Sequence, residues 1–158
     1  MSNLFPAEAG ITQMRGVLKL VKDNGDSMGI AELADEAEEE IDDLFPILDA
    51  CKILGLAKVE DGKVKLTEDG KKLNLKNMQK IIKGPLCEAE PFKTVLMAAK
   101  IEGSVTTEKL ADILKENNLA FYSDKLKYME QLRKLLVKWA VRLKILVYDQ
   151  ENDSWRAV

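Results

Sequence analysis

The most informative part of the chain is IDDLFPILDACKILGLAKVEDGKVKLT, residues 41–67. Its first half has apolar residues at helical spacing, which predicts one buried face made of Leu44, Ile47, Leu48, Cys51 and Leu54. Asp61-Gly62 then separates two short alternating runs, and these residue types tolerate the positive φ of a type I′ turn. The resulting β-hairpin would set Glu60 against Lys63, Val59 against Val64 and Ala57 against Leu66. A helix that runs into such a hairpin is the second half of a winged helix, a fold that favours binding of DNA or protein over catalysis.

The residues around this stretch predict three further helices. The first should run from about Ile11 to Asp23, with Asn24-Gly25 closing it, and the second should begin near Gly29. We expect Asp43 to be the N-cap of the third helix, which should end near Gly55, and this would place Pro46 in the first turn, where its missing N–H breaks no hydrogen bond. Thr67 should cap a short polar helix after the hairpin.

The same pattern returns in the second half of the chain. Glu32-Leu33-Ala34-Asp35 is echoed by Lys109-Leu110-Ala111-Asp112, and a long helix over 123–143 precedes a hairpin of 145–148 with 154–158. Two connecting helices, separated by Gly84-Pro85, are expected over 75–102. We therefore predict a mainly α-helical protein with small β-hairpins: a winged-helix-like module over 8–73, a helical linker over 74–102, and a second winged-helix-like module over 103–158 with a long third helix.

Composition indicates a globular protein of 158 residues, with 46% hydrophobic and 32% charged residues. No apolar run approaches the roughly 20 residues that a membrane-spanning helix needs, so we expect no membrane insertion. The first residues, MSNLFP, lack the basic start and apolar core of a secretory signal. The cytoplasm is the expected location.

The sequence offers little for catalysis. It has no histidine, which removes the usual general base and transition-metal ligand, and it has no G-x-x-x-x-G-K-[ST] phosphate loop. Neither Cys51 nor Cys87 lies in a C-x-x-C pair, so we expect both to be buried structural thiols. The acidic residues 38–43 lack the spacing of a calcium-binding loop. We expect Trp139 and Trp155 to be core residues. The chain is predicted to be no enzyme, with no catalytic residue, no cofactor and no metal site.

Charge is unevenly distributed. Residues 1–79 carry 10 Lys+Arg and 16 Asp+Glu, a net charge of −6, whereas residues 80–158 carry 14 and 11, a net charge of +3. In the first module, helical spacing places Asp42, Phe45, Asp49 and Lys52 on the solvent side of the third helix. Because this side would repel phosphates, we predict that it contacts a protein partner or is merely solvated. Phe45 would either anchor a partner or pack under Pro46 and the connecting helices.

The long helix of the second module carries a basic stripe, which we define as Lys127, Lys134, Lys138 and Arg142. It lies opposite an apolar face that includes Met129, Leu136 and Trp139. Lys125, Arg133 and Lys144 are nearby in sequence. Such a stripe is compatible with a solvated face or intramolecular contact, with an acidic protein partner, or with a nucleic-acid backbone.

Several short runs resemble the C-terminal AAA-associated domain family. They are Leu33-Ala34, residues 41–50, Leu54-Gly55-Leu56-Ala57, Leu66-Thr67 with Gly70, and, near the end, Leu136, Trp139-Ala140, Val147-Tyr148-Asp149 and Trp155. Ala140 stands where that family's pattern suggests glycine. Members follow the ATP-binding cassette in some ATPases of nitrate, sulfonate or bicarbonate import systems. The resemblance therefore implies a regulatory or protein-interaction module whose partner is an ABC-type ATPase subunit of an anion import system. The alternative is a winged-helix DNA-binding transcriptional regulator that uses the basic face of the second module.

Overall fold

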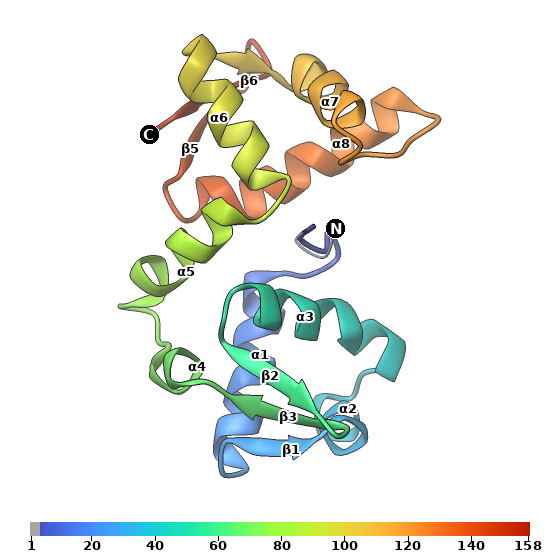
Figure 1. Cartoon of the computed structure of the whole chain (residues 1–158), viewed down its shortest axis with the longest axis vertical. Helices are drawn as coiled ribbons and strands as arrows, with labels where there is room; N and C mark the ends of the chain where they lie inside the picture. The colour runs from blue at the N-terminus through green and yellow to red at the C-terminus, as the bar shows by residue number, and fades with distance from the viewer. Residues whose placement is uncertain (1–3) are drawn as a thin grey trace. The chain divides into compact units, whose positions relative to one another are not determined.

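The computed structural model describes residues 4–158, which form two compact units. One unit comprises Phe5–Pro85 and the other comprises Leu4 with Leu86–Val158. Helix α5 (Met78–Glu88) crosses from one unit to the other. The expectation of a mainly helical chain with small antiparallel hairpins is confirmed (Figure 1). No helix within residues 4–158 is both long enough and apolar enough to cross a membrane.

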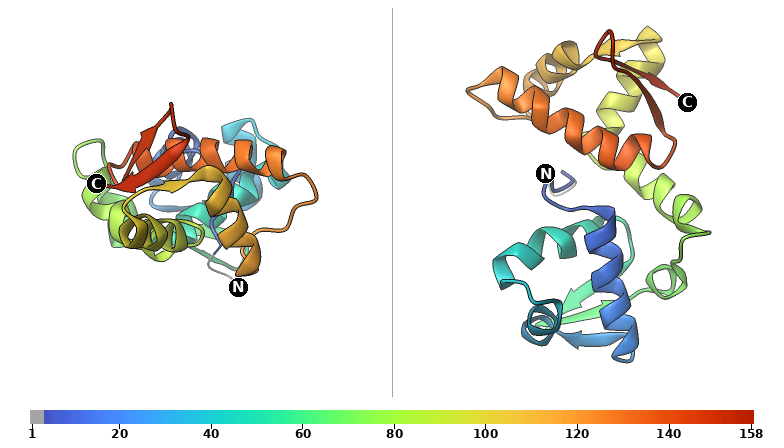
Figure 2. Two further views of the ribbon diagram at one scale, coloured as in Figure 1. Left: turned by 90° about the horizontal axis from the view of Figure 1, so that it is seen from above. Right: turned by 180° about the vertical axis from the view of Figure 1, so that it is seen from behind.

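Besides the first part of α5, the first unit contains four helices and a three-stranded antiparallel sheet. In chain order these are α1 (Ile11–Asp23), β1 (Ser27–Gly29), α2 (Ile30–Ala37), α3 (Ile41–Ile53), β2 (Ala57–Glu60), β3 (Lys63–Leu66) and α4 (Glu68–Lys72). The sheet order is β1-β3-β2. Helix α1 packs against α2, α3 and the sheet, and Figure 2 shows α1 and α3 side by side. The core of this unit is therefore formed by α1 and the helices and strands around it.

The second unit repeats this succession of elements. It contains α6 (Phe92–Glu102), β4 (Val105–Thr106), α7 (Thr107–Glu116), α8 (Lys125–Leu135), a π-helical turn η1 (Leu136–Val141), β5 (Leu146–Asp149) and β6 (Ser154–Ala157). Its sheet order, β4-β6-β5, corresponds strand for strand to that of the first unit. Because α6 contacts β6 and α7, it groups with the second unit, so the range 74–102 divides between the two units. Trp139 and Trp155 are fully buried, as expected for core residues.

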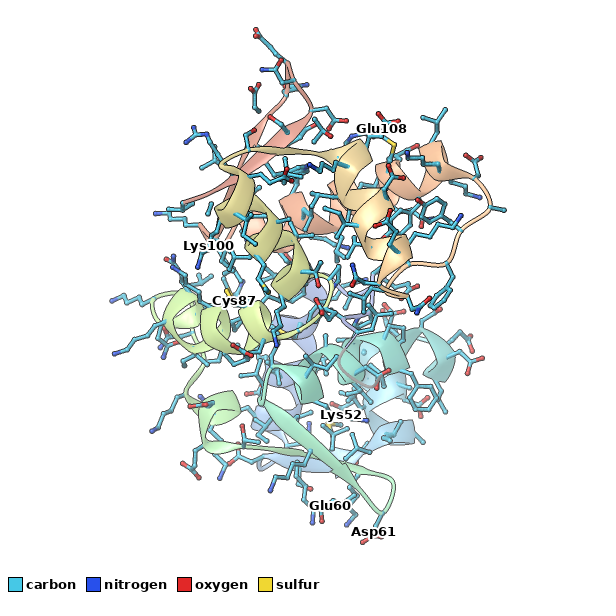
Figure 3. The ribbon with its side chains drawn as sticks, turned by 45° about the horizontal axis from the view of Figure 1, so that its top comes forward. Lys52, Glu60, Asp61, Cys87, Lys100 and Glu108 are labelled. Atoms are coloured by element: carbon cyan, nitrogen blue, oxygen red, sulfur yellow. The ribbon has the colours of Figure 1, made fainter. Side chains whose placement is uncertain are left out.

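The predicted hairpin register is confirmed. Val59 pairs with Val64 and Glu60 with Lys63, and the turn residues Asp61 and Gly62 have φ values of 52° and 73°. Figure 3 shows Glu60 and Asp61 at the tip of this hairpin. The side-chain oxygen of Thr67 accepts the Gly70 N–H at 3.1 Å, which confirms the predicted cap of α4.

The predicted start of α3 is wrong. The helix begins at Ile41, with Glu40 as N-cap and no side-chain capping bond, and the Asp43 and Leu44 amides both donate to the Glu40 carbonyl. Asp43 lies inside the first turn, where a carboxylate favours the positive end of the helix dipole. Pro46 consequently lies beyond the first turn and removes the helical bond to the Asp42 carbonyl.

The predicted break at Gly84-Pro85 is also wrong. Helix α5 continues through both residues, and the chain leaves helical geometry only around residues 89–91. Pro85 removes one hydrogen bond, but the buried side chains of Ile82 and Leu86 lie on either side of it. Tertiary packing of an apolar face contributes more to helix stability than a single backbone bond does.

Candidate functional site

The solvent side of α3 combines exposed apolar residues with charges. Ile41 and Phe45 are 42% and 45% exposed, although both are large hydrophobic residues. They are four residues apart, so they are neighbours on the helix surface. Asp42, Asp49 and Lys52 are exposed around them, and the Lys52 ammonium lies 3.5 Å from an Asp49 carboxylate oxygen (Figure 3 labels Lys52). The structure thus places all four predicted contact residues on one exposed helix side, which we call the α3 surface: Ile41, Asp42, Phe45, Asp49 and Lys52.

The opposite side of α3 explains why this surface faces outward. Leu44, Ile47, Leu48 and Cys51 are buried, and α3 packs against α1 and β2. Burial raises the pKa of the Cys51 thiol to about 12. Cys51 is therefore a neutral packing residue at ordinary pH and not a nucleophile. Cys87, which was expected to be buried as well, is only half-buried on α5 (Figure 3).

The basic stripe of the second unit is less regular than an ideal helix suggests. Lys127, Lys134 and Arg142 are exposed, whereas Lys138 is half-buried. Helix α8 ends at Leu135 and continues as the π-helical turn η1. Because a π turn holds more residues than an α turn, it shifts the phase of Lys138 and Arg142 relative to Lys127 and Lys134. The Lys134 ammonium also lies 3.4 Å from Glu130, which reduces the net charge of the stripe.

Two of the three cations near the stripe, Lys125 and Arg133, form ion pairs inside the unit. The Lys125 ammonium lies 2.8 Å from Asp112 and 3.3 Å from Glu108, both on α7 (Figure 3 labels Glu108). Its hydrogen bond to Asp112 is the main cause of a raised Lys125 pKa. Arg133 is paired with Asp153. Lys125 and Arg133, which lie near the stripe in sequence, therefore already have carboxylate partners within the second unit.

A polar cluster around Asp153 is the main feature that the sequence did not reveal. Arg133 donates two hydrogen bonds to its carboxylate, from Nε at 2.9 Å and Nη2 at 2.7 Å. The hydroxyls of Thr107 and Tyr148 donate to the same carboxylate at 2.6 and 2.7 Å, and the indole N–H of Trp155 donates to the Thr107 hydroxyl at 2.9 Å. The hydrogen bonds from Arg133 are the largest cause of an Asp153 pKa well below its usual range.

This cluster is structural in character. Asp153 lies in the turn before β6 and joins it to the first residue of α7 and to α8. Every polar partner in this cluster is already hydrogen-bonded, and the lowered pKa of Asp153 keeps its carboxylate ionised at neutral pH. The only sequence signal was Asn152-Asp153, which marks a turn but not its distant partners.

Comparison with known proteins identifies one family. A sequence model described as the C-terminal AAA-associated domain matches residues 31–149. The match includes α3, the first hairpin, the basic stripe and most of the second unit. Searches of curated proteins and of solved structures give no significant match.

Proposed function

Because this chain belongs to the C-terminal AAA-associated domain family, we propose that it is a non-enzymatic interaction module that regulates an ABC-type ATPase of an anion import system. We further propose that each unit is a winged-helix module. The support is topological: both units contain a helix, strand, helix, helix and two strands, with the same sheet order. Modules of this shape present a helix and a hairpin to a partner.

The observation that carries the proposal is the exposed pair Ile41 and Phe45 within the α3 surface. Large aromatic and aliphatic side chains at the centre of an interface commonly supply most of its binding energy. Asp42 and Asp49 beside them would meet basic groups on the partner and orient the approach. The partner surface is therefore proposed to hold an apolar pocket with a basic rim.

The test is binding between the full chain and the purified cassette subunit of an anion import system from the same genome, measured by titration calorimetry. Replacing Phe45 by Ser should weaken binding about thirtyfold, since loss of an interface anchor costs about 2 kcal/mol or more. Phe121→Ser is the matched control, because Phe121 is an 80% exposed phenylalanine of the second unit. Equal affinity of the two variants would contradict the α3 surface as the contact.

DNA binding is the second candidate, favoured by the exposed Lys127, Lys134 and Arg142. A DNA-binding protein should lose affinity steeply with added salt, because phosphate contacts release counterions. Reversal of Lys134, Lys138 and Arg142 to Glu should then abolish duplex binding. We expect no such salt-dependent binding by the wild type, because Lys125, Arg133 and Lys134 already face carboxylates. Tight duplex binding that the triple reversal removes would favour the DNA reading.

A further inference from the structure

A cleft of about 670 Å³ lies in the first unit, between α1 and the chain that follows α4. This volume is within the range of about 300–1,000 Å³ that is typical of small-molecule sites. Its charged lining residues are Arg15, Lys19, Lys22, Lys76 and Asp23. Four cations and one carboxylate therefore gather in the half of the chain that carries a net charge of −6 overall.

One wall of the cleft is a single side of α1. Arg15, Lys19 and Lys22 follow the i, i+4, i+7 spacing that aligns residues along a helix. From first to last they extend about 10 Å along the helix axis. Leu18 lies between them and gives this wall an apolar floor.

The other wall is formed by Gly70 of α4 and by the chain after α4. Helix α4 itself packs against α1 (Figure 1). The side-chain oxygen of Asn74 accepts the backbone N–H groups of Lys76 and Asn77 at 2.8 and 3.0 Å, which holds this segment in one conformation. It brings Lys76 to the cleft together with Leu75, whose side chain is 66% exposed. The cleft therefore combines cations with uncovered apolar surface.

Three of the four cations lack a carboxylate partner. Asp23 is paired with Lys19 at 3.0 Å, and the Lys22 ammonium donates to the Lys71 carbonyl at 3.0 Å. Across residues 4–158, neither Arg15, Lys22 nor Lys76 forms an ion pair. Arg15 is half-buried as well, and its guanidinium has no anionic partner among the described residues. An anion in the cleft would supply that partner.

We propose that this cleft binds a small phosphate-bearing organic anion. Its oxyanion groups contact Arg15, Lys22 and Lys76, and its apolar or planar part covers Leu18 and Leu75. A guanidinium matches the geometry of phosphate oxygens with two parallel donors, and lysines add charge along the α1 wall. The proposal concerns the isolated chain and is independent of any ATPase partner.

The test is calorimetric titration of the full chain at low salt with magnesium-free ATP and, separately, with inorganic tripolyphosphate. Arg15→Gln and Lys76→Gln should each weaken ATP binding at least about tenfold, as expected for loss of one charge-assisted hydrogen bond. Lys58→Gln is the matched control, because Lys58 is an exposed lysine on β2 outside the cleft. Leu75→Ser should weaken binding of ATP and leave that of tripolyphosphate unchanged. Thermal unfolding of each variant verifies the fold.

The two probes distinguish the sources of phosphate. Tighter binding of ATP than of tripolyphosphate supports an organic ligand with a body that the leucines contact. Equal affinity for both probes would overturn that assignment and leave a site for inorganic oxyanions. Absence of binding by either probe at millimolar concentration would overturn the proposal. Equal losses for Arg15→Gln, Lys76→Gln and Lys58→Gln would do so too, since they would reflect only net charge.

Discussion

Gly70 has a steric reason to be glycine. It is buried in α4, and a Cβ at this position would overlap the backbone carbonyl oxygen of Leu56. The Thr67 amide also donates to that carbonyl at 3.1 Å, so the oxygen is held in place. Close approach of two backbone segments fixes this residue, and α4 could not pack on the hairpin with a side chain here.

We therefore expect Gly70→Ala to destabilise the first unit by about 1–3 kcal/mol, the usual effect of overpacking. Gly16→Ala is the matched control, since Gly16 lies inside α1 and an added Cβ would meet no atom within 4 Å apart from its chain neighbours and the nearby backbone of α1 itself. It should stabilise α1 by up to about 1 kcal/mol through helix propensity. Urea unfolding followed by circular dichroism measures both changes. A neutral Gly70→Ala would show that α4 is free to move away from Leu56.

Asp153 leads to a pH-dependent prediction. Its pKa is depressed in the folded protein below the ordinary value of 3.8, chiefly by hydrogen bonds from Arg133. A depressed carboxyl pKa stabilises the fold above the unfolded pKa, and this contribution is lost as pH falls toward the folded pKa. Asp153→Asn should thus lower stability at pH 7 by about 2 kcal/mol, the typical value for a hydrogen bond to a charged group.

The check is thermal or urea unfolding of the wild type and Asp153→Asn across a pH series. The difference between them should be constant from neutral pH down to about pH 5 and should shrink below about pH 4, where the wild-type carboxylate becomes protonated in the unfolded state. A difference that stays the same down to pH 2 would mean that packing, and not the ion pair, explains the effect.

At the level of elements, the β2–β3 hairpin follows the rules of local sequence. Alternation places Val64 and Leu66 on the buried face and Lys63 and Lys65 on the exposed face, and Asp61-Gly62 sets the register between the strands. The third strand was not predicted: β1 has only three residues and pairs with β3 through Met28 opposite Val64. A segment so short has no recognisable period of its own.

From the hairpin register we expect opposite sensitivities to substitution at Val64 and Lys63. Val64→Asp should unfold the first unit, because it buries a carboxylate without a partner at a fully buried position. Lys63→Asp should change the free energy of unfolding by less than about 1 kcal/mol. The side chain at this position is solvated, and the new carboxylate would only lie opposite Glu60 on the exposed surface of the hairpin. Thermal unfolding measures both, and similar shifts in Tm would contradict the register.

At the scale of the whole molecule, the two units share their order of elements but differ in what they expose. The first unit presents the α3 surface and contains the basic cleft, whereas the second holds the Asp153 cluster and the interrupted basic stripe. The two units therefore share a topology but not a surface, since their charged and exposed residues lie at different positions.

Features that depend on neighbouring residues could be predicted from the sequence alone. These are the bounds of α1, the hairpin register, the Thr67 cap and the burial of the two tryptophans. Each follows from helical or strand periodicity, or from turn and cap chemistry, which act over a few residues. The start of α3 was missed because Pro46 is tolerated beyond the first turn when packing holds the helix.

Features that join distant parts of the chain became visible only in the folded protein. Thr107 and Asp153 are 46 residues apart, Gly70 approaches the Leu56 carbonyl, and Arg15 shares a cleft with Lys76. The spacing of residues along the chain does not predict such pairs, because the distance between the two side chains depends on how the helices and strands pack against one another. Local periodicity determines which face of each helix or strand is apolar. Which side chains of distant elements come into contact depends on how all of these apolar faces are buried together in one core.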